Sequence, residues 1–539
     1  MTNPITDLQK ADCILVIGSN FAENHPVLSR WIFDAKQRGA TLIVADPRLT
    51  PTAWSADLFL QLMPGSDTSL INALMHVIVA EKLYNKDFLE QRTTGFQALA
   101  EVVEKYSPEH AEKITHVPAA QIVRAARAYA KSRASSIVYC MGVTQHTCGT
   151  QTVINCANLA MLCGQAGRPG TGVNPLRGQD NVQGACDMGA LVNVYPGYQP
   201  VSDPAIRDKF SFAWGCQPDD LSLSPGLTVV EMSHAAERGK VRGMLVMGEN
   251  PIVGDPNANQ VRRALQSLSF LAVIELFLSE TAELADVVLP AAAFAEKRGT
   301  KTTTDRRVQW MERAVQPLGE AQPDWRILCQ LAASLGMEAS FQYEREEEIL
   351  EEIQKVTPSY AGISPQRVQA TTGGIPWPCP TLDHPGTPFL YANGFNKSDG
   401  RGHITPVEYQ APAEETSELY PLVLTSGRVM LHYNSGSMTR RTATLNRREP
   451  ELFVQIHPKT ADRYGVFTGG KAKVITRRGE ATARVRVTRQ IPKDVLFVPF
   501  HFKETNRLTI DALDPTAKIP EYKVAACRIE PAGEEEKGS

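Results

Sequence analysis

The chain has 539 residues and a formal net charge of −3, with 21% charged and 42% hydrophobic residues. This length exceeds what one hydrophobic core holds, so two to four domains are expected, and the near-neutral charge gives no reason to expect nucleic acid or an anionic membrane as a partner. The sequence shows neither a secretory signal at its amino terminus nor an apolar run of bilayer length, so no membrane span and a cytoplasmic location are expected.

The first part of the chain alternates buried strands with helices. Strands are predicted at residues 13–18, 41–48, 57–62 and 136–141, and helices at 27–40, 69–84, 119–131 and 152–163. This alternation is typical of a parallel, doubly wound sheet with helices on both faces.

A second copy of this pattern follows later in the chain. The segment "LVIGSN" at 15–20 returns as "LVMGEN" at 245–250, and each copy leads to an Ala-Asp strand that opens at Asp57 or Asp286. Chance similarity between two strand–helix–strand units is one interpretation. The matched order and spacing favour the other, a duplication that provides two related nucleotide-sized sites.

From about Glu418 the pattern changes to short strands separated by glycine, proline and charged turns, which predicts a β-barrel. A proline- and glycine-rich segment at 371–388 precedes it. The expected fold class is therefore α/β, with doubly wound parallel sheets in a duplicated arrangement followed by a carboxyl-terminal β-barrel. The expected domains are 1–180, 181–400 and 401–532, with a disordered tail at 533–539.

Ligands of open α/β sheets lie beyond the carboxyl ends of the strands, where Gly18, Ser19 and Asn20 follow the first strand and Asp46, Pro47 and Arg48 follow the second. No G-x-G-x-x-G motif is present, which argues against an ordinary NAD site. Asp46 can hold a ribose or accept two N–H donors from guanine or pterin, and Arg48 suits phosphate or ring stacking. A helix cap or a surface ion pair is the alternative for this "DPR" segment.

More loops of the same kind follow, in which a glycine lies beside a hydroxyl, amide or charged side chain. So many loops in one chain predict a large, polar, many-armed ligand. The candidate residues in these loops are Gly65, Asp67, Met141, Gly142, Gln145, Gly248, Glu249, Asn250, Ser279, Thr281, Thr425, Gly427, Arg428, His432, Ser437, Met438, Thr439, Tyr522 and Lys523.

The segment "NPLRGQDNVQGACDMGA" at 174–190 has no helical or alternating apolar pattern and holds one cation, Arg177, among glycines and amides. A guanidinium in such a loop suits a small carboxylate in two-point contact, and the amides suit polar cofactor atoms. An ion pair between Arg177 and Asp180 or Asp187 is the alternative.

These segments together, with "VIGSNFAENHP", "MGVTQ", "MGENP", "ADVVLP" and "IPEYK", resemble the molybdopterin oxidoreductases of the dimethyl sulfoxide reductase superfamily, and most closely the catalytic subunits of formate dehydrogenases. The resemblance covers about residues 10 to 530. It implies molybdenum or tungsten held by two molybdopterin guanine dinucleotides, oxidation of formate to CO2 as the metal goes from the +6 to the +4 state, and electron transfer to iron–sulfur subunits.

The resemblance also assigns roles to residues. It implies that Arg177 orients formate, that Gln179 lines the same pocket, and that His25, Gly178 and Asn506 join the loop residues above in holding the cofactor. Nitrate reductases of the same superfamily and cofactor-free structural subunits are the alternative functions.

One departure from the family pattern concerns the metal. Family members begin with a cysteine-ligated [4Fe–4S] segment and a metal-ligating cysteine or selenocysteine, but the ten cysteines here include no C-x-x-C pair, and none stands at that place. We therefore expect no iron–sulfur cluster and no metal ligand in this chain, and core packing for most of its thiols. A selenocysteine codon read as a stop upstream of Met1, or a second polypeptide, would supply the front part, and the chain alone is expected to be inactive.

Overall fold

The structure of the protein, a computed structural model, describes residues 1–533, so residues 534–539 of the expected disordered tail lie outside the described part. The chain folds into two compact units. Unit 1 comprises residues 1–178, 253–259 and 389 onward, and unit 2 comprises 179–252 and 260–388. Unit 1 thus combines the first α/β region with the barrel, and the division into three domains stays a prediction.

The sheet of unit 1 has five parallel strands in the order β3-β2-β1-β5-β6. The central strand β1 pairs in step with β2 on one side and with β5 on the other, so that Cys13 lies opposite both Thr41 and Ser135. Continuous apolar runs such as "CILVI" form these strands because both faces of a parallel sheet are covered. The strands are β1 (Cys13–Ile17), β2 (Thr41–Ala45), β3 (Leu58–Leu60), β5 (Ser135–Tyr139) and β6 (Gly172–Pro175).

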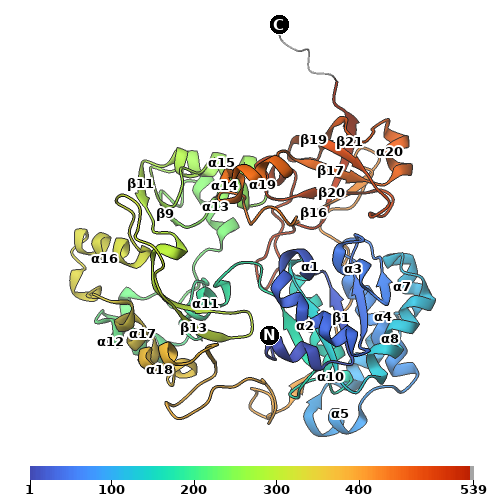
Figure 1. Cartoon of the computed structure of the whole chain (residues 1–539), viewed down its shortest axis with the longest axis horizontal. Coiled ribbons are helices and arrows are strands. Elements are labelled where there is room, and N and C mark those ends of the chain that lie inside the picture. The colour runs from blue at the N-terminus through green and yellow to red at the C-terminus, as the bar shows by residue number, and fades with distance from the viewer. Residues whose placement is uncertain (534–539) are drawn as a thin grey trace. The chain divides into compact units, whose positions relative to one another are not determined.

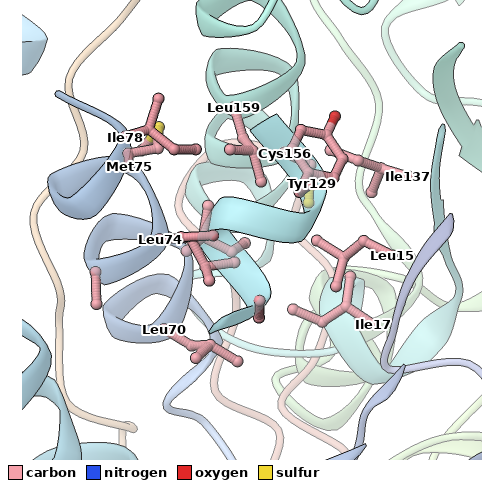
Figure 2. Packing of buried hydrophobic residues seen from close by; sticks show 14 of the residues in the cluster. Leu15, Ile17, Leu70, Leu74, Met75, Ile78, Tyr129, Ile137, Cys156 and Leu159 are labelled. Atoms are coloured by element: carbon pink, nitrogen blue, oxygen red, sulfur yellow. The ribbon is translucent and has the colours of Figure 1, made fainter. Parts of the chain in front are cut away.

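Helices cover both faces of this sheet (Figure 1). On one face α4 (Asp67–Ala80), α8 (Ala119–Lys131) and α10 (Gly149–Leu162) pack on Leu15, Ile17 and Ile137, as Figure 2 shows. On the other face α2 (Pro26–Gln37) packs on the alternate side chains of β1 and β2. Each such fully buried aliphatic side chain stabilises the fold by about 1.5–3 kcal/mol.

The remaining α/β elements of unit 1 are short. They are η1 (Ile5–Lys10), α1 (Phe21–Asn24), α3 (Pro51–Trp54), α5 (Lys86–Arg92), β4 (Thr93–Thr94), α6 (Phe96–Val103), α7 (Pro108–Thr115), α9 (Met141–Thr144) and β15 (Gly402–His403).

The carboxyl-terminal part of unit 1 is a closed barrel in the order β16-β20-β17-β19-β18-β21. Along β19, exposed Glu480, Thr482 and Arg484 alternate with buried Ala481, Ala483 and Val485, as expected for a strand with one face inside. The barrel strands are β16 (Leu422–Gly427), β17 (Phe453–Ile456), β18 (Lys471–Ile475), β19 (Glu480–Val487), β20 (Val495–Pro499) and β21 (Ala525–Pro531), with η7 (Thr439–Arg441), α19 (Ala443–Arg448), α20 (Pro458–Tyr464) and η8 (Thr505–Arg507) between them.

Unit 2 holds a smaller parallel sheet in the order β11-β10-β9, formed by β9 (Gly243–Met247), β10 (Phe270–Glu275) and β11 (Val287–Pro290). A second, antiparallel sheet joins β12 (Gly299–Thr302), β13 (Arg307–Met311) and β14 (Ile375–Pro376). The other elements between residues 179 and 388 are α11 (Val182–Asp187), β7 (Val194–Tyr195), β8 (Gln199–Pro200), α12 (Pro204–Trp214), η2 (Pro218–Asp220), α13 (Val229–Glu237), α14 (Pro251–Gly254), α15 (Ala258–Gln266), η3 (Ala282–Leu284), η4 (Phe294–Glu296), α16 (Asp324–Ser334), η5 (Glu338–Ser340), α17 (Glu346–Val356), η6 (Pro358–Tyr360) and α18 (Pro365–Ala370).

The expected fold class is confirmed: parallel α/β sheets precede a closed six-stranded barrel. Every strand and helix predicted in the first 165 residues is present with small shifts at its ends. Within residues 1–533, no helix combines the length and the apolar character needed to cross a bilayer.

Candidate cofactor and substrate site

The two "G-x-N" loops adopt the same backbone conformation. Gly18 has φ +56° and donates its N–H to the carbonyl of Ala45 over 3.0 Å, while Gly248 has φ +64° and donates to Ile274 over 2.9 Å. Glycine fits both positions because other residues rarely adopt positive φ. Each loop therefore turns away from its strand at the same point.

The asparagines of the two loops are held by equivalent threonines. In the first copy, Thr52 Oγ1 donates to Asn20 Oδ1 over 2.9 Å and accepts the N–H of Ala22 over 3.0 Å. In the second, Thr281 Oγ1 donates to Asn250 Oδ1 over 2.8 Å and accepts the N–H of Ile252 over 3.3 Å. The sequence analysis predicts that the side chains of Thr281 and Asn250 bind the cofactor. In the structure these side chains support the loop.

Two further contacts repeat between the copies. The carboxylates of Asp57 and Asp286 accept the N–H of Leu42 and of Leu271 over 2.8 and 2.7 Å. Ser279 Oγ accepts the N–H of Ala282 over 3.3 Å, as Thr50 Oγ1 does from Ala53. Chance similarity does not produce four matched hydrogen-bond patterns, so the sequence echo reflects a duplicated strand–loop–helix unit.

In unit 1 the first loop lies against a second glycine loop. A Cβ at Gly18 would lie 2.7 Å from the carbonyl carbon of Gly142, and one at Gly142 would lie 2.6 Å from Gly18 Cα. The N–H of Gly142 also donates to the carbonyl of Gly18 over 3.0 Å. The loops after β1 and β5 therefore meet at the carboxyl edge of the sheet, where parallel α/β folds bind ligands.

The "DPR" segment after β2 is enclosed rather than a surface ion pair. Asp46 Oδ1 accepts the backbone N–H of Arg48 over 2.8 Å, and burial raises the pKa of Asp46 despite the neighbouring Arg48 charge. The Arg48 guanidinium stacks on Phe497 of the barrel at 3.5 Å and donates to Gln455 over 3.2 Å. Pro47 accepts an N–H of Gln61 through its carbonyl.

Buried ionisable groups lie between the first sheet and the barrel of unit 1. Burial raises the pKa of Asp67 to about 6 and lowers that of Lys523 to about 8. His146 Nδ1 lies 2.9 Å from Glu521 Oε1, and this carboxylate raises the pKa of His146 although burial works against it. Such a group of titratable side chains withheld from water is typical of ligand sites and also of structural ion-pair networks.

Sequence reasoning missed His146 and Glu521 as members of this group. His146 directly follows Gln145 of the "MGVTQ" loop, and Glu521 lies inside the quoted "IPEYK" segment. Their positions beside predicted residues were the available signal. The duplication also points to Glu275 as a candidate residue, because it ends β10 at the position that Asp46 occupies after β2.

The backbone around Arg177 is held at two consecutive carbonyls of unit 1. His25 Nε2 lies 2.7 Å from the carbonyl of Arg177, and Arg428 donates to the carbonyl of Gly178 over 3.1 Å. A carbonyl only accepts, so His25 carries its proton on Nε2. Burial lowers the pKa of His25, and the charge of Arg428 lowers it further, which keeps the ring neutral.

Several polar side chains of the 174–190 segment are engaged within the fold. The amide of Asn174 donates to Ser136 over 2.7 Å, and that of Gln183 donates to Asp187 over 2.7 Å. Asp187 also accepts the hydroxyl of Tyr360 over 2.6 Å, and Lys301 lies 3.3 Å from Asp180. Although its sequence has no helical or alternating apolar pattern, the segment contains the end of β6 and all of α11.

The barrel residues predicted to hold the cofactor divide into two groups. Asn506 donates its amide to the carbonyl of Val253 over 2.7 Å, and the Tyr522 hydroxyl donates to that of Gly254 over 3.0 Å, so both hold backbone of residues 253–259. The second group forms one loop, in which His432 Nδ1 lies 3.2 Å from Thr439 Oγ1 and Met438 is exposed.

The other predicted residues lie beside these loops. Gly65 has φ +82°, Lys523 donates to the carbonyl of Ser426 over 2.9 Å, and the carbonyl of Gln145 accepts the N–H of Tyr522 over 3.2 Å. Thr425, Gly427, Met141 and Ser437 belong to the strand ends and loops already described, Gln179 is the first residue of unit 2, and Glu249 is exposed.

The residues of unit 1 fit a polar dinucleotide. Thirteen buried side-chain polar atoms make no hydrogen bond within residues 1–533. Three of them, Ser19 Oγ, His25 Nδ1 and Arg428 Nε, belong to predicted cofactor residues. A buried polar atom without a partner costs about 1–3 kcal/mol, so these atoms call for a ligand that supplies donors to Ser19 and His25 and an acceptor to Arg428.

A metal ligand set is a different matter. No cluster of three or more His, Cys, Asp or Glu side chains suited to a metal ion occurs in the described part of the chain. Cys13, Cys140, Cys156, Cys163 and Cys527 are buried as free thiols, and burial raises the pKa of each. These thiols fill core space.

Comparison with known proteins gives consistent matches. Residues 1–334 match the molybdopterin oxidoreductase family, and residues 422–526 match the molybdopterin dinucleotide binding domain. The alpha subunit of an F420-dependent formate dehydrogenase from Methanocaldococcus jannaschii is 50% identical over 98% of this chain and 78% of its own length. The catalytic subunit of an assimilatory nitrate reductase from Bacillus subtilis is 38% identical over 98% and 76%.

Among solved structures, acetylene hydratase from Pelobacter acetylenicus superposes with a TM-score of 0.76 at 19% identity, over 98% of this chain and 81% of that one, which shows the shared fold. The family match spans more than half of the chain, and the relatives align over nearly all of it. The chain therefore belongs to the molybdopterin oxidoreductase family.

Proposed function

We propose that the protein is the catalytic subunit of a formate dehydrogenase and that Arg177 binds formate. The 50% identity with an alpha subunit of that enzyme supports the reaction class. The observation that supports the substrate site is that two consecutive carbonyls are held in place: His25 binds that of Arg177, and Arg428 binds that of Gly178. His25 and Arg428 each also have a buried polar atom without a partner in residues 1–533.

The proposed role of Arg177 follows from the shape of formate. A guanidinium fork binds both carboxylate oxygens at once, and such a charge-assisted contact is worth about 1.5–3 kcal/mol. With both oxygens held, the C–H bond of formate points directly away from the fork. Arg177 thus orients the bond that must break, and Gln179, two residues on, adds a polar side chain to the same segment.

The cofactor of the proposal is a pair of molybdopterin guanine dinucleotides, one for each copy of the duplicated unit. Asp46 would accept N–H donors of a guanine edge, while Ser19, His25 and Arg428 offer their unpaired atoms to the same ligand. When bound, the group would supply molybdenum or tungsten as acceptor of the two electrons of formate oxidation.

The metal-ligating residue and the iron–sulfur cluster belong, in this proposal, to polypeptide beyond these 539 residues. The buried, protonated state of the thiols described above supports this assignment. Electrons leave through iron–sulfur partner subunits. The misread selenocysteine codon, the inactivity of the chain by itself and the cytoplasmic location stay predictions.

The test uses a chimaera in which residues 1–539 replace their matched region in the Methanocaldococcus relative, produced with molybdenum or tungsten supplied. The proposal predicts formate-dependent dye reduction, one metal and two guanine nucleotides per chain. Activity with nitrate and none with formate would assign the protein to the nitrate reductase type. A folded chimaera that contains neither metal nor pterin would make it a structural subunit and contradict the proposal.

A further inference from the structure

Two neighbouring strands of the barrel bring Arg428 and His501 close together. The strands β16 and β20 pair in parallel, with Gly427 opposite Pro499 (Figure 1). The N–H of Phe500 continues this pairing by donating to the carbonyl of Gly427 over 3.1 Å. Because parallel strands end at the same edge of the barrel, the residues that follow them, Arg428 and His501, lie at that edge together.

The ring of His501 is fully buried, and its two partners determine its tautomer. Nδ1 lies 2.6 Å from the carbonyl of Asn434, which can only accept, so the proton is on Nδ1. Nε2 then accepts the backbone N–H of Val429 over 3.0 Å. Both nitrogens of His501 thus bind one loop, residues 428–436, which we call the Arg428 loop.

The ring makes both contacts only while it is neutral, since a protonated Nε2 could not accept the N–H of Val429. Burial lowers the pKa of His501 to about 3, with smaller contributions from His432 and from the charge of Arg428. The ring is therefore neutral near pH 7, and each of its nitrogens keeps a fixed role.

The Arg428 loop packs directly on the backbone of His501. Asn434 and Gly436 have φ of +48° and +77°, so the loop turns sharply at both residues. A Cβ at Gly436 would lie 2.8 Å from the carbonyl oxygen of His501, which leaves room for glycine alone. Within the loop, the Arg428 guanidinium lies over the ring of Tyr433 at 4.7 Å.

The same loop reaches the proposed substrate segment. Arg428 donates to the carbonyl of Gly178 over 3.1 Å. Because Val429 directly follows Arg428, its hydrogen bond to His501 fixes the backbone from which the guanidinium extends. A continuous series of contacts within unit 1 therefore leads from His501 through the Arg428 loop to the residue beside Arg177.

We propose that His501 is a positioning residue for formate binding, which acts through Arg428 on the backbone of residues 177 and 178. The imidazole holds the Arg428 loop at two points and so sets the direction of the guanidinium. The guanidinium fixes the Gly178 carbonyl, and with it the start of the Arg177 side chain. This inference rests on the proposed function, in which Arg177 binds formate, and it requires no contact between His501 and the substrate.

Hydrogen exchange of the 539-residue chain tests this series of contacts without cofactor or substrate. His501→Phe keeps a buried aromatic ring but removes both hydrogen bonds. We expect exchange to become about tenfold or more faster in peptides that cover the Arg428 loop and in those that cover 176–178, because both segments open more often. Faster exchange in the Arg428 loop alone would overturn the proposal.

Thr460→Val is the matched control for a lost buried hydrogen bond. The buried hydroxyl of Thr460 accepts the N–H of Asp494 over 3.1 Å in another part of the barrel. Its removal should leave exchange in the Arg428 loop and at 176–178 unchanged. If Thr460→Val speeds exchange at 176–178 as much as His501→Phe does, the effect is a general loss of barrel stability and the proposal fails.

A double-mutant cycle decides whether His501 acts through Arg428. Arg428→Ala in the 539-residue chain should by itself speed exchange at 176–178. In that background His501→Phe should add nothing further at 176–178, because the contact through which it acts is already lost. Additive effects of the two substitutions would show another route and would overturn the proposal.

Kinetics of the chimaera with the Methanocaldococcus relative test the effect on substrate. His501→Phe is expected to raise KM for formate about fivefold, the effect of one hydrogen bond, with a smaller change in kcat. In His501→Gln the amide again offers one donor and one acceptor, so KM should return towards that of the parent. A His501→Phe enzyme with a lower melting temperature but the parent's KM would make the residue merely structural. A parent chimaera that does not oxidise formate would instead refute the proposed function, and the exchange experiments would still decide the role of His501.

Discussion

The ring of His25 contacts the backbone of the proposed substrate residue through one nitrogen and has its other nitrogen buried without a partner in residues 1–533. Its Nε2–H donates to the Arg177 carbonyl over 2.7 Å, while Nδ1 is buried and has no partner within residues 1–533. One neutral imidazole can thus hold the arginine backbone and still accept a hydrogen bond from a ligand. This makes His25 a positioning residue for Arg177.

The first prediction concerns that hydrogen bond. His25→Leu in the chimaera with the Methanocaldococcus relative removes the donor to Arg177, and we expect KM for formate to rise about tenfold, the equivalent of one hydrogen bond, with a smaller change in kcat. His25→Gln, whose amide can reach the same carbonyl, should recover most of the loss. A purely structural role would instead lower the melting temperature and kcat together, with no rescue by glutamine.

The second prediction concerns Asp67, whose pKa burial raises to about 6 from 3.8. The unfolded chain loses this proton near pH 4 and the folded chain near pH 6, so folding takes up a proton between these values and stability falls as pH rises through this window. At pH 7 the raised pKa of Asp67 lowers the free energy of unfolding by about 3 kcal/mol. Asp67→Asn should therefore raise the melting temperature at pH 7 and leave it unchanged at pH 4.

Asp57 is the control because its shift has the opposite sign. Burial opposes the shift, but the Leu42 N–H and the Lys36 ammonium hold the pKa of Asp57 below its ordinary value. Its stabilising contribution is present above about pH 4 and is lost as pH falls. Asp57→Asn should therefore lower the melting temperature at pH 7. If Asp67→Asn lowers it as well, the burial argument for Asp67 fails.

At the scale of elements, the duplicated loops offer a matched pair of glycines. The Cβ added by Gly248→Ala has no atom within 4 Å. The substitution is therefore expected to lower the free energy of unfolding only by the strain of the positive φ, about 1–2 kcal/mol. Gly18→Ala adds a Cβ 2.7 Å from the backbone of Gly142 and Val143, so the total should reach about 3 kcal/mol or more.

The measurement is urea unfolding followed by hydrogen exchange, which resolves β1 from β9. Gly18→Ala should lower the protection of β1 more than Gly248→Ala lowers that of β9. Equal losses would mean that the close approach of the loops after β1 and β5 does not constrain Gly18.

The elements that the sequence predicts well are those with a strong local pattern. Runs such as "CILVI" and "TLIVA" can only be strands of a covered sheet, and the helix at 119–131 is found with the same ends as expected. By contrast, β6 consists of Gly-Val-Asn-Pro and carries no periodicity. Its strand character comes from pairing with β5, which no local pattern reveals.

The candidate site follows the same division. Glycine loops at strand ends could be found from spacing alone, while the role of Arg177 stays a prediction. The pairing of His146 with Glu521 could not, because it joins the first sheet to the barrel. Nor could the sequence tell that Asn250, Thr281 and Asn506 would engage their side chains within the fold.

At the scale of the whole molecule, the two copies of the duplicated unit belong to parallel sheets of different size. The first half has a complete five-stranded sheet, and the second has three strands with one apolar face exposed. The chain spans about 78% of the length of the Methanocaldococcus relative.

The central claim is that the Arg177 guanidinium holds formate. Arg177→Lys in the chimaera keeps the charge but loses the two-point fork, and the measurement is kcat/KM for formate together with pterin and metal content. The account predicts a fall in kcat/KM of about 10- to 150-fold, which corresponds to 1.5–3 kcal/mol, with the cofactor content unchanged. An Arg177→Lys enzyme that oxidises formate as efficiently as its parent would contradict the account.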